Sequence, residues 1–298
     1  MRVEEAARAL AGDGLVLDLG ALRVRVRSVL PDLPAPLACV YRHLPAGEPD
    51  AFVDCEVDLV PARSLRRPWR PGVRFLADGT EPFSPLPEGM SLPQLEWGLN
   101  WVFAQLASRH LLLHAGALEH RDRGLLLVAA PGSGKSTLTA ALALAGMRVL
   151  SDEFGVLRLA DGCLLPLPKP VSLKNASIAL IAGRTGHPVI GPTFHRTHKG
   201  DVAHLAVPAQ AVARRHEVVQ PALIVFPSWR RGARLERIPV RPARALAELA
   251  GNSFNYGLLG PAGFAAAADL VARCDCWRLV FGDLDEALDA LFALADAR

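Results

Sequence analysis

A glycine-rich segment near the middle of the 298-residue chain has the clearest capacity for chemistry. Residues 129–137 read Ala-Ala-Pro-Gly-Ser-Gly-Lys-Ser-Thr, which fits the Walker A pattern with alanine at its first glycine position. Gly132 and Gly134 allow the backbone to turn so that successive N–H groups point at phosphate oxygens, and the start of the following helix adds partial positive charge. We therefore predict an ATP or GTP site. Its expected contact residues are Ala130, Pro131, Gly132, Ser133, Gly134, Lys135, Ser136 and Thr137.

Two side chains of this segment and an acidic pair further along have distinct expected tasks. Lys135 is expected to reach the β- and γ-phosphates, and the Ser136 hydroxyl to ligate Mg²⁺. The acidic pair, Asp152 and Glu153, follows a short apolar run 17 residues beyond Lys135. Most motor-type ATPases place their acidic strand much further along the chain. The sequence also contains neither the Asn-Lys-x-Asp motif of GTPases nor an LSGGQ-like signature of ABC-type ATPases, so these features favour another class of P-loop protein.

The elements around these motifs are predicted to alternate between strand and helix. Apolar runs at 111–118 and 124–130 predict buried strands, 135–145 predicts a helix, and 147–150 predicts a third strand. This order is typical of an α/β nucleotide-binding unit. The alternation of strand and helix patterns continues downstream, with expected strands at 222–226 and 277–281 and expected helices at 242–250 and 261–273. A last helix is expected from Asp283, which has cap spacing to Glu286.

The first 90 residues have a different sequence pattern, with many prolines and short segments in which apolar and charged residues alternate. Apolar residues alternate with arginines over 22–27 and with acidic residues over 53–59, so the exposed charges of the two strands would complement each other if the strands paired. A helix is expected from Ser91, which has capping-box spacing to Gln94. We predict a smaller β-rich accessory region over 1–90 and a catalytic domain over 91–298. Trp97 and Trp101 of the expected helix are interpreted as core or domain-contact residues and not as a ligand-stacking pair.

Composition and charge exclude several classes of protein. The chain is 51% hydrophobic and 21% charged, which indicates a globular protein, and its net charge of +3 is far from the basic excess that nucleic-acid binding requires. Five scattered cysteines indicate reduced thiols. The N-terminus lacks a signal-peptide core, and the sequence has no run of 18 uncharged apolar residues. We therefore expect a cytoplasmic protein without nucleic-acid or membrane partners.

The three motifs in register resemble those of the HPr kinase/phosphorylase family and, more distantly, those of the phosphoenolpyruvate carboxykinase-like kinase fold. That family carries a His-Gly pair on the strand before the P-loop and an Asp-Asp pair on the strand after the following helix. This chain has His114-Ala115-Gly116, the glycine-rich segment and Asp152-Glu153 at similar intervals. The resemblance is close over 110–175 and extends loosely to the C-terminus. It implies an α/β fold with a P-loop core of the HPr kinase type.

The resemblance also implies an activity, ATP-dependent phosphorylation of a serine-type hydroxyl. Asp152 matches the catalytic aspartate that accepts the proton of the attacking hydroxyl. Glu153 would help Asp152 and Ser136 to hold Mg²⁺, and His114 would tune the charge of Asp152. Members of the family assemble as oligomers, so the resemblance implies that this chain could form a homo-oligomer. It does not indicate which surface would form the interface.

The chain departs from the family in two places. The loop associated with phosphorolysis has no clear match, the nearest segment being 182–187, so the resemblance does not extend to the reverse reaction and leaves it open. The N-terminal region does not resemble the usual accessory domain, which favours a peptide or small protein over HPr as the acceptor. Two alternatives stay open: a nucleotide-binding regulatory or assembly module, and an ATPase without a phosphoacceptor.

Two basic segments lie downstream. The segment 193–201 contains Arg196 and Lys199, which would neutralise a transferring phosphoryl group or bind an acidic acceptor, unless this segment is a solvated loop. The segment 229–234 is interpreted as a solvated turn.

Overall fold

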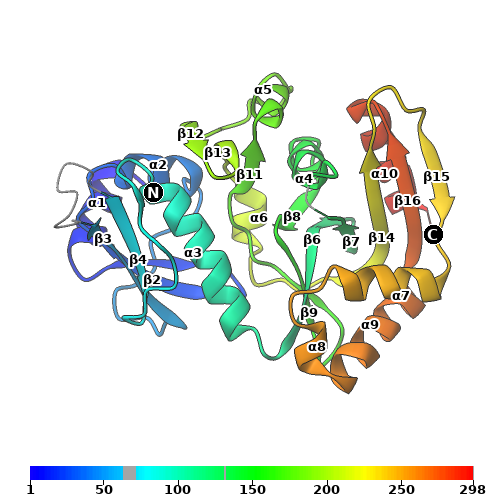
Figure 1. The fold of residues 1–298 in the computed structure, drawn as a ribbon, viewed down its shortest axis with the longest axis horizontal. Helices are drawn as coiled ribbons and strands as arrows, with labels where there is room; N and C mark the ends of the chain where they lie inside the picture. The colour runs from blue at the N-terminus through cyan, green and yellow to red at the C-terminus, as the bar shows by residue number, and fades with distance from the viewer. Residues whose placement is uncertain (63–71, 131, 298) are drawn as a thin grey trace.

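The computed structural model describes residues 1–62, 72–130 and 132–297 (Figure 1). Within them the chain is a mixed α/β protein with ten helices and three sheets. No helix in the described ranges is long and apolar enough to cross a membrane.

The N-terminal part contains a five-stranded sheet in the order β1-β2-β3-β4-β5. The predicted pairing of the two charged strands is confirmed, because β2 and β3 are parallel neighbours with Arg25 opposite Glu56. Glu56 accepts ion pairs from Arg25 at 2.8 Å and from Arg27 at 2.7 Å. The bounds are α1 Val3–Ala11, β1 Leu15–Asp18, β2 Arg23–Ser28, α2 Pro34–Val40, β3 Cys55–Ala62, β4 Gly72–Ala77 and β5 Leu86–Pro87.

The helix α3 (Ser91–Leu106) packs its apolar face on this sheet. A Cβ on Gly98 would lie 2.1 Å from the Phe75 ring, so the absence of a side chain there lets helix and strand approach closely. The predicted capping box is wrong. The Ser91 hydroxyl donates instead to the Asp32 carboxylate at 2.7 Å, and Asp32 also accepts the backbone N–H of Ser91 at 3.2 Å.

The larger part of the chain is built on an eight-stranded sheet in the order β10-β9-β6-β7-β14-β16-β15, with β8 paired to β6. The strand β7 lies between antiparallel β6 and parallel β14. The expected strands in this region are confirmed. Their bounds are β6 His110–His120, β7 Arg123–Val128, β8 Arg148–Ser151, β9 Phe154–Arg158, β10 Leu164–Leu165, β14 Gln220–Trp229, β15 Glu236–Pro239 and β16 Asp275–Phe281.

Helices cover both faces of this sheet (Figure 1). Because successive side chains of a strand point to opposite faces, Leu127 of β7 packs with α4 and α10, while Leu126 packs with α7 and α9. The Asp283 cap is confirmed, since its carboxylate accepts the N–H groups of Asp285 and Glu286. The bounds are α4 Lys135–Leu144, α7 Pro242–Gly251, α8 Tyr256–Leu259, α9 Pro261–Arg273 and α10 Leu284–Asp296.

A small third sheet lies between the two parts of the chain, in the order β11-β13-β12. Its strands are antiparallel, and the turn between β12 and β13 carries His198 and Lys199. The bounds are β11 Val171–Lys174, α5 Ala176–Ala182, β12 Phe194–Thr197, β13 Gly200–Leu205 and α6 Ala209–Ala213.

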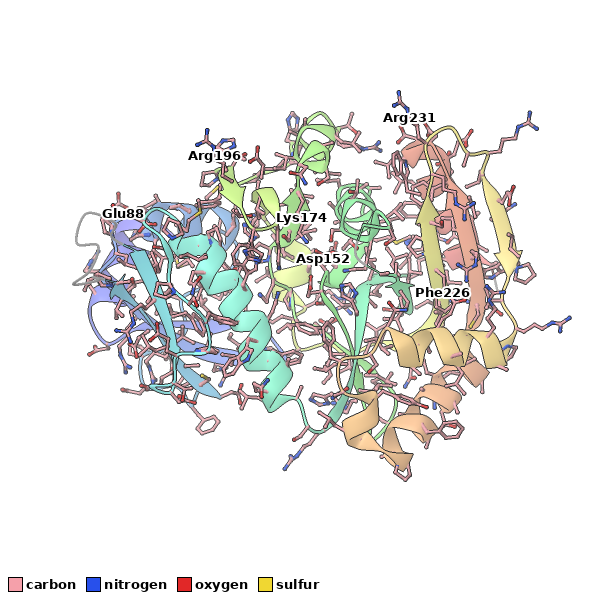
Figure 2. All side chains as sticks on the ribbon, in the orientation of Figure 1. Glu88, Asp152, Lys174, Arg196, Phe226 and Arg231 are labelled. Atoms are coloured by element: carbon pink, nitrogen blue, oxygen red, sulfur yellow. The ribbon has the colours of Figure 1, made fainter. Side chains whose placement is uncertain are left out.

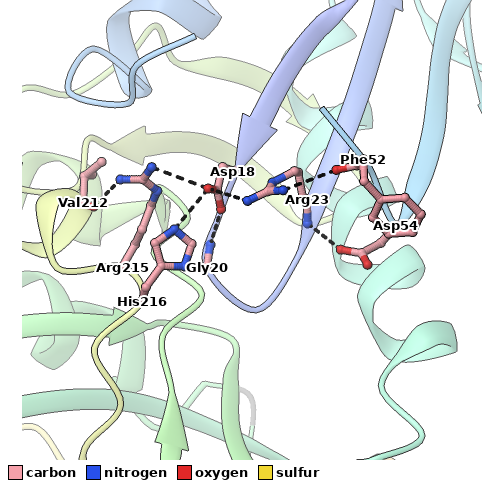
Figure 3. A network of polar contacts seen from close by, with 8 residues as sticks. All are labelled: Asp18, Gly20, Arg23, Phe52, Asp54, Val212, Arg215 and His216. Carbon is pink, nitrogen blue, oxygen red and sulfur yellow. Dashed lines mark hydrogen bonds and ion pairs between the residues drawn. The ribbon is translucent and has the colours of Figure 1, made fainter. Parts of the chain in front are cut away.

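Asp18, at the end of β1, links the N-terminal sheet to the segment after α6 through ion pairs (Figure 3). Asp18 lies 3.1 Å from Arg23 of its own sheet, 3.5 Å from Arg215 and 3.1 Å from His216. Burial alone would raise the pKa of Asp18, but these cations and the N–H of Gly20 lower it overall. The contacts keep this carboxylate ionised as a tether between the two parts of the chain.

Candidate active site

The predicted phosphate cradle lies where β7 ends and α4 begins. Gly132 and Gly134 have φ angles of 87° and 89°, in the left-handed region that glycine adopts without strain, and Gly134 is the N-cap of α4. Ala130 and Gly132 are exposed, while Ser133, Ser136 and Thr137 are half-buried around the helix start. The side-chain oxygen of Ser133 has no hydrogen-bond partner among the described residues. Pro131, also a predicted contact residue, lies outside the described residues.

The strand order explains why the acidic pair lies beside this cradle. Both β7 and β8 are antiparallel to β6, which runs between them, so the carboxyl ends of β7 and β8 meet at one edge of the sheet. The cradle follows β7 and Asp152 follows β8, while His114 lies on β6 near the same edge. The topology thus brings the three sequence motifs together.

Lys135 and Asp152 are both buried, with 6% and 5% of their surfaces exposed. The Lys135 ammonium donates to the Asp152 carbonyl oxygen at 2.5 Å and lies 3.9 Å from the carboxylate Oδ1. The other carboxylate oxygen, Oδ2, accepts the backbone N–H of Ser172 at 3.3 Å. Burial raises the pKa of Asp152, and the opposing charge of Lys135 does not cancel that rise.

The Asp152 Oδ1 atom is the best indication of a cation site. It is buried and has no hydrogen-bond partner among the described residues, although a buried polar atom normally has one. A Mg²⁺ ion prefers oxygen ligands, often one or two carboxylates completed by phosphates and water. Asp152, Glu153 and Ser136 fit that preference. They do not form a complete cage, because the described residues contain no group of three His, Cys, Asp or Glu side chains arranged around a metal.

His114 lies close to the second acidic residue. Its Nε2 is 3.9 Å from Glu153 Oε1, and its ring meets the Phe254 ring edge-on at 5.7 Å. Burial, helped by the charge of Lys135, lowers the pKa of His114, so the imidazole is neutral at neutral pH. For Glu153, burial opposes ionisation, but the cations Lys135, Lys174 and Lys199 lower the pKa overall. The site therefore pairs a neutral imidazole with an ionised Glu153.

Two asparagines after α7 hold the strand that carries His114, a role that the sequence did not reveal. The carbonyl of Asn252 accepts the backbone N–H of His114 at 2.6 Å. The Asn255 side chain accepts from the Leu112 N–H at 2.9 Å and donates to the His110 carbonyl at 2.8 Å. These bonds join residues more than 130 positions apart, which no local pattern encodes.

A cleft adjoins Asp152 between α3 and the β12–β13 turn. Two neighbouring pockets share the same wall of Trp97, Asn100, Glu153 and Lys199. The Lys199 ammonium lies 4.9 Å from the centre of the Trp97 ring. Trp97, which we expected to be a core or domain-contact residue, contacts Lys199 and lines the cleft. The inner pocket further includes Asp152, Ser172 and Lys174, and the outer pocket includes Phe83, Trp101 and His198.

A buried ion pair fixes α3 at the side of this cleft. The Lys169 ammonium lies 3.2 Å from Glu96 Oε2 and donates to Asn100 Oδ1 at 2.6 Å. The Tyr41 hydroxyl donates to the other Glu96 oxygen at 2.6 Å. Each buried charge therefore has partners, which is the condition under which a buried ion pair is tolerated.

The structure keeps other predicted residues away from the site. The segment 182–187 lies beside the last turn of α4, where Gly186 approaches the Leu144 carbonyl. At 1.5 Å per residue Leu144 is about 14 Å along the helix from Lys135. Arg196 is exposed on β12 and its N–H donates to Asp201, whereas Lys174 lines the inner pocket with Asp152 (Figure 2).

A scan against models of known protein families finds no match for this chain, and a search of the curated proteins finds no relative. Function is therefore inferred from the geometry of the site.

Proposed function

We propose that this chain is an ATP-dependent kinase with a P-loop core of the HPr kinase type, which transfers the γ-phosphoryl group to a serine-type hydroxyl of a peptide or small protein. One observation carries the proposal: the glycine-rich helix start at Lys135 faces a buried carboxylate, Asp152, and one oxygen of this carboxylate, beside the cleft, has no hydrogen-bond partner among the described residues. Phosphoryl transfer depends chiefly on positioning and on charge stabilisation, and this site offers both.

The nucleotide binds through its phosphates at the start of α4. The first backbone N–H groups of a helix have no partner within the helix and would bind the phosphates here, and Lys135 would exchange its bond to the Asp152 carbonyl for the β- and γ-phosphates. Ser136, Asp152 and Glu153 would hold Mg²⁺. When bound, this ion neutralises charge on the phosphates.

The acceptor hydroxyl enters through the cleft and meets Asp152, which takes its proton. Burial raises the pKa of Asp152 and so strengthens it as a base. Neutral His114 adds no charge that would weaken this base. Lys174 and Lys199 are exposed cations at the wall of the cleft, where they stabilise negative charge on the transferring group or on the acceptor. The use of ATP and the five free thiols are consistent with a cytoplasmic enzyme.

The test is an incubation with Mg²⁺, γ-labelled ATP and the small proteins or peptides encoded beside its gene, followed by mass analysis. We expect an acceptor that gains one phosphate with the wild-type protein and not with Asp152→Asn. The matched control is Asp161→Asn, because this aspartate lies in an exposed turn after β9, paired with Arg158. ATP binding without any transfer would point to a regulatory module, and steady ATP turnover without an acceptor would point to an ATPase.

A further inference from the structure

Trp229, the last residue of β14, is a large aromatic residue with 51% of its surface exposed. It lies directly beside the phosphate cradle. Its backbone N–H donates to the Ser133 carbonyl at 3.4 Å, and its Cβ is 3.4 Å from the position that a Cβ on Gly134 would occupy. The segment 229–234, interpreted from sequence as a solvated turn, thus starts in contact with the predicted site.

The side chain of Trp229 leaves the sheet on the same face as α4. Leu223 and Val225 of β14 belong to the cluster that packs under α4, and Trp229 has the same parity along the strand. Residues of the other parity, such as Phe226 (Figure 2), pack with α7 and α9. The Phe281 ring lies 3.7 Å from the same Gly134 position. The side chain of Trp229 therefore projects beside the first turn of α4, next to the apolar cluster that packs under this helix.

The sheet order determines which part of a nucleotide would meet Trp229. The strand β7 has β6 on one side, with β8 and Asp152 beyond it, and β14 on the other side. A nucleotide with its γ-phosphate at Asp152 and its other phosphates over residues 132–135 must extend its base toward β14. The carboxyl ends of parallel β7 and β14 meet at this edge, where open α/β sheets bind ligands.

We infer that Trp229 is the platform on which the base of the nucleotide stacks, an inference that rests on the proposed function. Aromatic side chains bind bases through their π-faces. The following turn holds the platform in place, because the Arg230 N–H donates to the Phe281 carbonyl at 2.8 Å and the Ala233 N–H donates to the Arg230 carbonyl at 3.0 Å. Gly282 lies against this turn, where a Cβ would come within 2.7 Å of Ala233.

Comparing two ligands, Mg²⁺·ATP and Mg²⁺·tripolyphosphate, tests the inference, because tripolyphosphate has the phosphates without the base. We expect Trp229→Ala to weaken ATP binding about tenfold, or about 1.4 kcal/mol, and to leave tripolyphosphate binding unchanged. Trp229→Phe keeps an aromatic face and retains most of the ATP affinity. Phe264→Ala is the matched control, because Phe264 is an exposed aromatic residue on α9, which covers the opposite face of the sheet.

Two results would overturn the inference while leaving the proposed function intact: unchanged ATP affinity in Trp229→Ala, or equal weakening of ATP and tripolyphosphate, which would mean that Trp229 only shapes the cradle. A wild-type protein that binds neither ligand would overturn the proposed function itself, together with the inference.

Discussion

Replacement of His204 is expected to change how the stability of the protein depends on pH. His204 lies on β13 opposite Ser172 of β11, with 1% of its surface exposed. Burial lowers its pKa to about 4; Glu96 opposes this shift, and Lys169 and Lys174 add to it. In the unfolded chain the pKa of the imidazole returns to its ordinary value of 6.5. The unfolded state therefore binds a proton that the folded state rejects throughout the range between these two values.

The sign and size of the effect follow from proton linkage. The contribution of His204 to the free energy of unfolding is fully present above pH 6.5. It is lost as the pH falls toward the folded pKa of about 4. Each pKa unit corresponds to about 1.4 kcal/mol, so the full loss is about 3 kcal/mol, of which about 2 kcal/mol is reached by about pH 5.

Urea unfolding at several pH values measures this loss. Between about pH 7.5 and about pH 5, we expect the free energy of unfolding of His204→Gln to fall by about 2 kcal/mol less than that of the wild type. His204→Phe gives a second comparison if glutamine is poorly accommodated, and exposed His187→Gln is the control. Parallel pH dependence of wild type and both His204 variants would refute the reasoning.

Three further predictions concern the site and its supports. Burial raises the pKa of Asp152, so the acid limb of the pH profile of kcat/KM should lie above the ordinary aspartate value of 3.8; a limb at or below that value would contradict the assignment. Gly116→Ala should destabilise the protein by about 1–3 kcal/mol in thermal unfolding, because its Cβ would stand 2.4 Å from Thr139 Oγ1, and adding Thr139→Ala should recover part of the loss. Lys169→Met should cost about 3–5 kcal/mol in urea unfolding, because Glu96 would remain buried and unpaired, whereas the double variant with Glu96→Gln should cost less.

Local signals predicted much of the fold. The periodicity of β2, β3, β7 and β14 and the cap at Asp283 are properties of short segments, and each is found where the sequence indicates. The glycine-rich turn was equally readable, because positive φ angles at Gly132 and Gly134 are a local requirement.

Long-range contacts were not readable in the same way. The start of α3 is capped by Asp32, which is 59 positions before Ser91. The local Ser91–Gln94 spacing therefore predicted the wrong partner for Ser91. Trp229 lies almost a hundred residues after Gly134 in the chain, and only the parallel pairing of β7 with β14 brings them together. Propensity and periodicity set the faces of each strand, but strand order decides which residues share an edge.

The central claim, that Asp152 is the base in phosphoryl transfer, is tested most directly by measuring two quantities on one variant. With Asp152→Asn, the rate of phosphate transfer from Mg²⁺·ATP to the acceptor should fall by about 10²–10⁴-fold, the usual contribution of a general base. The affinity for ATP measured without Mg²⁺ should stay close to that of the wild type, because the cradle at residues 132–137 is unchanged. Transfer at the wild-type rate by the Asp152→Asn protein would contradict the claim.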